Sequence, residues 1–296
     1  MTAQKHVLDY SYYPGCSLHA SAKEYDESTR GLFRALNIGL KEVPDWFCCG
    51  ATPAHNVDEL LSLSLCAKNL ELANDVPGDL AVACAACFSR LKTAQHKLAS
   101  DPEKRRQVEF AIDASVPEEK RVKHLLEILA SDYGLESLEA AVKKPLAGLT
   151  VACYYGCLLT RPPEVPELDC IEAPTIMERV IGATGAQTVD WSHRLECCGA
   201  NFTLSRPGVV LKLSGDILAS ARDAGANCVV VACPLCHGNL DIRQREIEEA
   251  TGEHFGLPVF YMTQLLALAV GVRASKLGFD SMIVNPQPLL KEKGLL

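Results

Sequence analysis

Cys228 begins a continuous apolar run, Cys228-Val229-Val230-Val231-Ala232, that leads directly into the cysteine pair of Cys233-Pro234-Leu235-Cys236. A run of this kind is typical of a parallel strand that is covered on both faces. The stretch Leu80-Ala81-Val82-Ala83 leads in the same way into Cys84-Ala85-Ala86-Cys87. Each C-x2-C motif is expected to open a helix, so both stretches predict strand–helix alternation and therefore an α/β fold.

Each C-x2-C motif is the last part of a five-cysteine pattern that occurs twice in the chain. The spacing is C-x31-CC-x34-C-x2-C in the first half and C-x39-CC-x34-C-x2-C in the second. Two equal sets of thiols at matching spacings indicate an internal duplication with one iron–sulfur or metal site in each copy. The first set is Cys16, Cys48, Cys49, Cys84 and Cys87, and the second set is Cys157, Cys197, Cys198, Cys233 and Cys236.

The duplication predicts two domains, residues 1–144 and residues 145–296. The two tryptophans of the chain support it, because Asp45-Trp46 and Asp190-Trp191 precede the adjacent cysteines of the two halves. We expect each tryptophan to be a packing anchor. Residues 101–141 contain no cysteine and have helical character, so they are expected to form a helical linker at the end of the first domain.

A similar order of elements is expected in both halves. A strand before the first cysteine and two helices are predicted in each, at residues 7–13, 22–38 and 57–74 and at residues 149–155, 175–184 and 207–224. The predicted fold class is α/β, with tandem duplicated domains that each form a small, mostly parallel sheet flanked by helices. Binding sites of open α/β sheets form at the carboxyl ends of the strands, where three cysteines of each set are placed.

Composition and charge exclude several classes of partner and compartment. The 296-residue chain has a net charge of −8 and no run rich in lysine and arginine, so nucleic acid is not an expected partner. No secretory signal precedes the first strand. The most hydrophobic stretch, residues 257–272, is too short to span a bilayer and is expected to be a strand followed by a buried helix. A cytoplasmic location is predicted, where fourteen cysteines favour metal binding or catalysis over disulfides.

The residue types of each set point to metal chemistry. A C-x2-C turn at a helix start lets both sulfurs reach one metal or cluster, with backbone N–H groups facing the thiolates. Adjacent cysteines reach the same site only if the backbone turns after them, and Gly50 and Gly199 supply that freedom. A structural zinc site or a cubane cluster takes four ligands. The fifth thiolate therefore indicates an unusual cluster or a ligand that exchanges with substrate, and a zinc site is the alternative.

Other residues near the motifs are weaker candidates. His237 follows the second C-x2-C motif where the first half has Phe88, so it is a candidate proton donor, against the alternative of a helix-surface histidine. With it, Cys49 and Cys198 are the candidate catalytic residues. The cysteines outside the sets are expected to be buried as small hydrophobic residues: Cys66, Cys153, Cys170 and Cys228. Cys153 is the best extra ligand among them. Further polar candidates, for which a solvated surface position is the alternative, are His55, His193, Arg161 and Arg206.

With these motifs the chain resembles the B subunit of heterodisulfide reductase and the cysteine-rich (CCG) domain family, over essentially its whole length. The contexts that carry the resemblance are Tyr13-Pro14-Gly15-Cys16, Cys48-Cys49-Gly50-Ala51, Cys153-Tyr154-Tyr155-Gly156-Cys157 and Cys233-Pro234-Leu235-Cys236-His237. The resemblance implies two noncubane [4Fe-4S] clusters, one on each five-cysteine set. It also implies a disulfide that is cleaved between the clusters in one-electron steps.

The resemblance further implies a complex. The chain has no flavin or nucleotide motif and no ferredoxin-type cysteine run, so electrons must pass to or from partners. By resemblance these are the small iron–sulfur C subunit and the flavin-bearing A subunit of such a complex. The expected function is disulfide reduction, or thiol oxidation, on a substrate that is free or bound to a carrier. The alternatives are an electron-transfer subunit in sulfur oxidation or in respiratory glycolate, lactate or glycerol-phosphate oxidation, and a zinc-binding scaffold without turnover.

Overall fold

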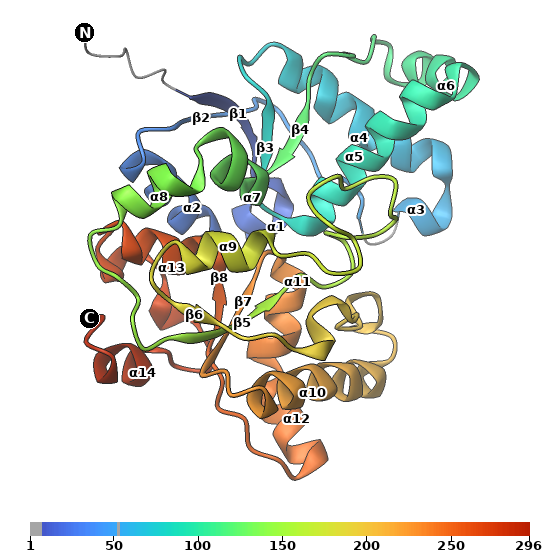
Figure 1. The fold of residues 1–296 in the computed structure, drawn as a ribbon. Coiled ribbons are helices and arrows are strands. Elements are labelled where there is room, and N and C mark those ends of the chain that lie inside the picture. Colours follow the sequence, from blue (N-terminus) through green and yellow to red (C-terminus); the bar gives the residue numbers. More distant parts are fainter. Residues whose placement is uncertain (1–7, 52–53) are drawn as a thin grey trace, which may run out of the picture.

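The computed structural model describes residues 8–51 and 54–296, and these form two four-stranded parallel sheets with helices around them (Figure 1). The first sheet has the order β2-β1-β3-β4 and the second has the order β6-β5-β7-β8, so the two halves share one topology. The first sheet consists of β1 (Asp9–Tyr13), β2 (Gly39–Glu42), β3 (Leu80–Val82) and β4 (Val122–His124). The second consists of β5 (Thr150–Tyr154), β6 (Gln187–Thr188), β7 (Cys228–Val231) and β8 (Val259–Tyr261).

The apolar runs that predict buried strands lie in the middle of the sheets. Every residue of β3 and β7 is buried, and each strand has a parallel neighbour on both sides. The register pairs Tyr12 with Ala81 in the first sheet and Ala152 with Val229 in the second. The predicted α/β fold with duplicated, parallel sheets is therefore confirmed.

The helices follow the strands in the expected order, with short additional turns. The first half contains α1 (Gly15–His19), α2 (Lys23–Ala35), α3 (Ala54–Val57), α4 (Glu59–Asn74), α5 (Ala85–Ser100), α6 (Pro102–Ile112), α7 (Leu125–Glu127), the π-helix η1 (Ile128–Asp132) and α8 (Leu135–Ala141). The second half contains α9 (Ile176–Gly182), η2 (Ser192–Leu195), η3 (Ala200–Phe202), α10 (Pro207–Asp223), α11 (Pro234–His237), the π-helix η4 (Gly238–Ile242) and α12 (Gln244–Thr251). After β8 come α13 (Met262–Ala269), η5 (Ala274–Lys276), η6 (Phe279–Ser281) and α14 (Gln287–Glu292).

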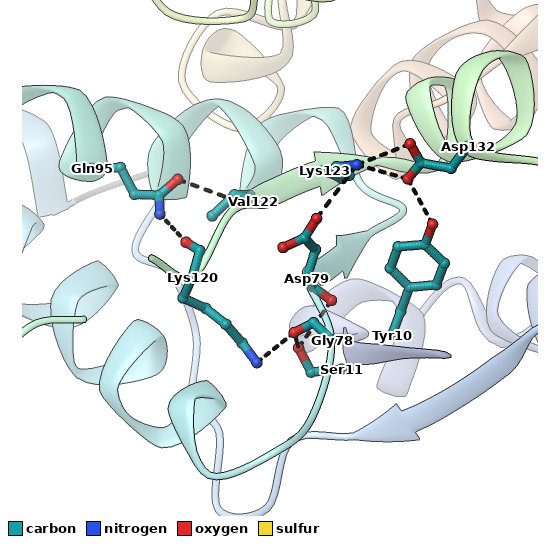
Figure 2. Close-up of polar contacts among 9 residues, drawn as sticks. All are labelled: Tyr10, Ser11, Gly78, Asp79, Gln95, Lys120, Val122, Lys123 and Asp132. Carbon is teal, nitrogen blue, oxygen red and sulfur yellow. Dashed lines mark hydrogen bonds and ion pairs between the residues drawn. The ribbon is translucent and has the colours of Figure 1, made fainter. Parts of the chain in front are cut away.

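Residues 101–141 do more than link the halves, because they contribute β4 to the first sheet. Two lysines at this strand fix its position (Figure 2). Lys120 donates hydrogen bonds to the carbonyls of Val76 and Gly78, the latter at 2.6 Å. Lys123 binds Asp132 at 2.7 Å. The purely helical linker of the sequence analysis is thus incomplete, because a three-residue strand with a charged centre gives no apolar run.

The two halves meet along a seam and share one hydrophobic core. Helices α2 and α13 pack against each other there (Figure 1), and the buried hydroxyls of Ser28 and Thr263 lie 2.7 Å apart. At the carboxyl edge of the sheets the backbone N–H of Ala85 donates to the carbonyl of Ala232 at 3.0 Å. The seam is therefore a packed interface with its own hydrogen bonds.

No helix in residues 8–51 and 54–296 is long and apolar enough to cross a membrane. The stretch at residues 257–272 forms β8 followed by the buried helix α13, as predicted.

Candidate metal centre

The cysteines are positioned by the ends of the strands. Cys16 lies on α1 directly after β1, and Cys84 and Cys233 are the N-cap residues of α5 and α11, directly after β3 and β7. Each C-x2-C motif therefore opens a helix, and the first backbone N–H groups of that helix face its sulfurs. This arrangement brings three cysteines of each set to the carboxyl edge of its sheet.

The backbone turns at the glycine that follows each pair of adjacent cysteines. Gly50 and Gly199 have φ angles of 71° and 81°, which lie in the region that favours glycine. Their N–H groups donate to the sulfurs of Cys48 at 3.4 Å and Cys197 at 3.3 Å. A Cβ atom on Gly50 would lie only 2.7 Å from Cβ of Ala54, so the turn also requires the missing side chain.

The turn sends the two cysteines of each pair to different neighbours. In the first set Cys48 Sγ lies 3.5 Å from Cys16 Sγ, at the exposed side, and buried Cys49 Sγ lies 3.4 Å from Cys87 Sγ. The second set repeats this pairing. Cys197 hydrogen-bonds to Cys157, and the sulfurs of Cys198 and Cys236 lie 3.6 Å apart. In each set two pairs of sulfurs therefore lie close together near the end of the sheet, and the thiol that opens each C-x2-C motif interacts with the second cysteine of that motif.

The two sets adjoin at the seam. The backbone N–H of Ala85 donates to the carbonyl of Ala232, and the thiols of Cys84 and Cys233, next to these residues, shift each other's pKa. Both cysteines are buried. Sequence spacing predicts one site per half but not this contact, which depends on how the halves pack.

Interactions between the thiols lower the pKa of some cysteines and raise the pKa of others. The Cys157 thiol, with the N–H groups of Gly199 and Ala200, lowers the pKa of Cys197 to about 6. Hydrogen bonds from Cys236 and Cys84 hold the pKa of Cys233 well below its usual range. The same interaction with Cys233 raises the pKa of Cys84. Thiolates of this kind, at exposed Cys197 and at buried Cys233, are stabilised by a bound cation.

The donor set fits an iron–sulfur centre better than a structural zinc ion. Thiolate ligands select zinc, copper(I) and iron–sulfur clusters, but a structural zinc ion is closed by four ligands and each set has five. Within the described residues, no three side chains of cysteine, histidine, aspartate or glutamate are already arranged around one point for a metal ion. The fit therefore rests on the identity and convergence of the donors.

The cysteines outside the sets divide by location. Cys66, Cys153 and Cys228 are buried, as predicted, and burial raises the pKa of each thiol. The prediction is wrong for Cys170, which is exposed in the proline-rich loop before α9. That loop has no periodic apolar pattern, so its cysteine is not drawn into the core. Cys153 lies on β5, where it pairs with Val230 of β7, and the interactions between the thiols of the second set do not include it.

His237 is buried and not a helix-surface residue. Its ring stacks on Tyr261 with centroids 4.3 Å apart, and one ring nitrogen hydrogen-bonds to the backbone of Val259. Burial lowers the pKa of His237 to about 4. The other nitrogen, Nε2, is buried and has no hydrogen-bond partner among the described residues. At neutral pH the ring is therefore uncharged and presents a free acceptor, whereas the sequence suggests a proton donor.

The other polar candidates lie away from the seam at which the two cysteine sets adjoin. Arg161 and Arg206 are exposed, and His193 forms a 2.8 Å hydrogen bond with its neighbour Ser192 at the surface. His55 has a pKa lowered by burial, and its buried Nδ1 has no partner among the described residues. The tryptophans pack beside the sets on tyrosines, Trp46 on Tyr13 with ring centroids 5.4 Å apart and Trp191 on Tyr154 at 6.2 Å.

Sequence reasoning missed a ring stack that crosses the seam. Tyr25, from α2, stacks on Tyr261, from β8, with centroids 4.2 Å apart, and His237 covers the other side of Tyr261. The Tyr25 hydroxyl donates to the carbonyl of Ala83 at 2.7 Å, next to Cys84. The only sequence signal was the position of Tyr261 at the carboxyl end of a strand. Asn239, which donates to the Cys198 carbonyl at 3.1 Å, was also missed.

Comparison with known proteins places these observations in a family. The cysteine-rich domain (CCG) family matches residues 10–92 and 151–241, which include both five-cysteine sets. The chain is 33% identical over 284 residues to the 8-methylmenaquinol:fumarate reductase membrane anchor subunit of Wolinella succinogenes, covering 95% of this chain and 99% of that protein. It is 30% identical over 281 residues to the B subunit of the ferredoxin/F420H2-dependent CoB-CoM heterodisulfide reductase of Methanosarcina acetivorans, covering 93% of each.

Two further similarities agree with this. A protein of Archaeoglobus profundus, named as similar to the B subunit of heterodisulfide reductase, is 29% identical over 281 residues, covering 91% of this chain and 93% of that protein. A hypothetical protein from Helicobacter pylori has a similar fold, with a TM-score of 0.76 and 12% identity, and the match covers 95% of this chain and 55% of that one. With two matching domains and relatives of full length, this chain belongs to the cysteine-rich domain (CCG) family.

Proposed function

We propose that the chain is the iron–sulfur subunit of a heterodisulfide reductase-like complex, and that it cleaves a disulfide, or joins two thiols, where its two cysteine sets adjoin. The observation that carries this proposal is the contact of the two C-x2-C motifs across the seam, where the N–H of Ala85 donates to the carbonyl of Ala232 at 3.0 Å and the thiols of Cys84 and Cys233 shift each other's pKa. Relatives named for the B subunit of heterodisulfide reductase, which match over nine tenths of the chain, support it.

Cleavage of a disulfide consumes two electrons and two protons and yields two thiols. Iron–sulfur centres deliver electrons singly, so one centre on each side of the bond lets both sulfurs receive an electron without a free radical leaving the site. In this proposal each five-cysteine set holds one [4Fe-4S] cluster of the noncubane type, which supplies the electrons. The ligands are Cys16, Cys48, Cys49, Cys84 and Cys87 for one cluster and Cys157, Cys197, Cys198, Cys233 and Cys236 for the other.

The chain's own residues have three tasks in this scheme. The stacked rings of Tyr25, Tyr261 and His237 are almost wholly buried, so they exclude water from the seam and fix the spacing of the halves. Nε2 of His237 accepts a hydrogen bond from a thiol of the reacting pair. Cys49 and Cys198, the inner cysteines, contact the C-x2-C motifs and are the ligands placed to exchange with substrate.

Partners complete the proposal. No ferredoxin motif or nucleotide motif is visible in the sequence, so we propose that a small iron–sulfur protein and a flavoprotein of the same complex exchange electrons with it. The thiols require a reducing compartment, so a cytoplasmic location is part of the proposal.

A second candidate function is an electron-transfer subunit of a respiratory reductase. The relative from Wolinella succinogenes favours it, because that protein is named as a subunit of a quinol:fumarate reductase and matches along its whole length. In this case the adjoining sets pass electrons to each other, and no disulfide enters the seam.

Anaerobic purification of the chain with its co-purifying proteins tests both candidates. About eight irons and eight acid-labile sulfides per chain are expected for two clusters. Under the first candidate a reduced one-electron dye supports turnover of a small disulfide. Under the second, the dye reduces the clusters, no disulfide is consumed, and the co-purifying flavoprotein carries the activity. Two zinc ions per chain and no iron would refute both.

A further inference from the structure

A hollow of about 650 Å³ lies at the seam on the side of the sheets opposite the cysteines. One wall is α2 of the first half, and the other is formed by residues 271–276, around η5, of the second half. Helix α2 begins at the cysteine edge, where Tyr25 binds the carbonyl of Ala83, and runs back toward the amino end of β2. The hollow is thus remote from the metal centre, and a ligand bound in it is independent of the proposed function.

The walls of the hollow carry more cations than carboxylates. Its charged lining residues are Arg30, Arg34, Arg273, Lys276 and one carboxylate, Glu27. A second hollow of about 340 Å³ shares Arg30 and Arg34, and extends the same surface toward the start of β2. A cationic recess of this size is unexpected on a chain with a net charge of −8.

Arg30 is held in place by the chain itself. Its guanidinium binds Asp26 at 2.7 Å and Glu42 at 2.5 Å, and lies over the Tyr12 ring. The three other cations differ from it. The side chains of Arg34, Arg273 and Lys276 make no ion pair or hydrogen bond with any residue that the structure describes.

Three unpaired cations around one hollow repel each other, and a bound anion removes that repulsion. The ordinary role of a basic residue at a helix C-terminus accounts for Arg34, which lies in the last turn of α2. It does not account for Arg273 and Lys276, which the other half brings to the same hollow. A planar guanidinium group can donate two parallel hydrogen bonds to two oxygens of one phosphate or carboxylate group.

We propose that this hollow binds a small polyanion, a molecule with at least two phosphate or carboxylate groups, across the seam of the two halves. Its volume lies within the range of small-molecule sites, roughly 300–1,000 Å³. Because the walls come from both halves, the ligand bridges α2 and η5 and stabilises the packing of the two halves.

Calorimetric titration of the purified, cluster-loaded complex with pyrophosphate and with citrate tests this proposal. The double variant Arg273→Glu/Lys276→Glu is compared with the control Lys212→Glu/Arg245→Glu. The control changes the net charge by the same amount at an exposed lysine and an exposed arginine. Each of these forms an ion pair only within its own helix, Lys212 with Asp216 at 2.9 Å and Arg245 with Glu249 at 3.0 Å. We expect saturable binding of one of the two anions, weakened at least about tenfold in the seam variant and within about twofold of the parent in the control.

Each result decides the proposal. Pyrophosphate binding identifies a phosphate ligand, and citrate binding identifies a carboxylate ligand. No saturable binding of either anion, or equal weakening in both double variants, would overturn the site. Binding of a polyglutamate peptide where both small anions fail would overturn it too, in favour of an acidic partner protein. Should the seam variant lose its iron or its helical circular dichroism, the single variant Arg34→Gln replaces it under the same criteria.

Discussion

The thiols of Cys84 and Cys233 face each other across the seam and shift each other's pKa, although the two cysteines lie in different halves of the duplicated chain. Each caps a helix at the end of a central strand, so the contact joins the two carboxyl edges at which metal sites of α/β sheets form. The duplication thus places two equivalent cysteine-rich edges in contact. Under the proposed function, a reaction that needs two one-electron centres gains both from one chain.

Replacement of Cys84 by alanine is expected to remove the first cluster and leave the second. Iron should fall from about eight to about four per chain, and disulfide turnover should be lost, because one of the two electron donors is missing. The control is Cys228→Ala, a buried cysteine on β7 outside the sets, which should keep its iron and lose only about 1 kcal/mol of unfolding free energy. Equal iron loss in both variants would contradict the ligand assignment.

The central strands could be predicted from the sequence because their signal is local. β3 and β7 are short apolar runs that end at cysteines, and the repeat of the pattern identifies both at once. The turn at Gly50 and Gly199 was predictable for the same reason, since adjacent cysteines require it. Strand β4 was missed because Val122-Lys123-His124 has a charged centre, and its place is fixed by contacts to Asp132 and to the loop at Gly78 (Figure 2).

Features that arise from packing between distant segments could not be predicted. The burial of His237 depends on Tyr261, which lies on the next strand, and on Tyr25, which comes from the other half. The contact of Cys84 with Cys233 likewise requires the seam to form. In contrast, residue type alone predicted a core position for Cys170, and this failed because its loop stays at the surface.

Replacement of His237 by phenylalanine tests the role of its free nitrogen. Phe88 occupies the equivalent position in the first half, where it packs edge-on against His124 with centroids 5.4 Å apart, so the change reproduces a side chain that this fold already accommodates. We expect the stack on Tyr261 and the iron content to persist, while disulfide turnover falls about 100-fold because Nε2 is absent. Full turnover in this variant, with the half-buried His193→Phe as control, would leave His237 a structural residue only.

The glycine after each adjacent cysteine pair should be essential for its metal set. Gly50→Ala places a Cβ atom 2.7 Å from Ala54 at a φ of 71°, whereas Gly225→Ala meets no atom within 4 Å at a φ of 83°. Both variants carry the strain of a left-handed alanine, about 1–2 kcal/mol, but only the first also moves the cysteines. Iron analysis should therefore show loss of the first cluster in Gly50→Ala alone. Comparable iron in the two variants would show that the turn tolerates a side chain.

Asp241 should make the stability of the second half depend on pH. Burial raises the pKa of its carboxyl to about 6, although the backbone N–H groups of Ile283 and Val284 donate to it at 2.8 Å and 3.1 Å, and the nearby Glu24 raises it further. The carboxyl of Asp241 therefore keeps its proton up to about pH 6 in the folded state, whereas in the unfolded state it releases the proton near pH 4. Its contribution to the free energy of unfolding is full below about pH 4 and is lost as the pH rises through about 6.

The corresponding experiment is denaturant unfolding of the parent and of Asp241→Asn between pH 5 and pH 7, where the parent should lose about 1 kcal/mol from this group as pH rises. The variant has no proton to release, so its unfolding free energy should change less over the same interval. The exposed Asp216→Asn on α10 serves as the control and should follow the parent. If Asp241→Asn keeps the full slope of the parent, the carboxyl is ionised in the folded protein throughout, and the two backbone bonds outweigh its burial.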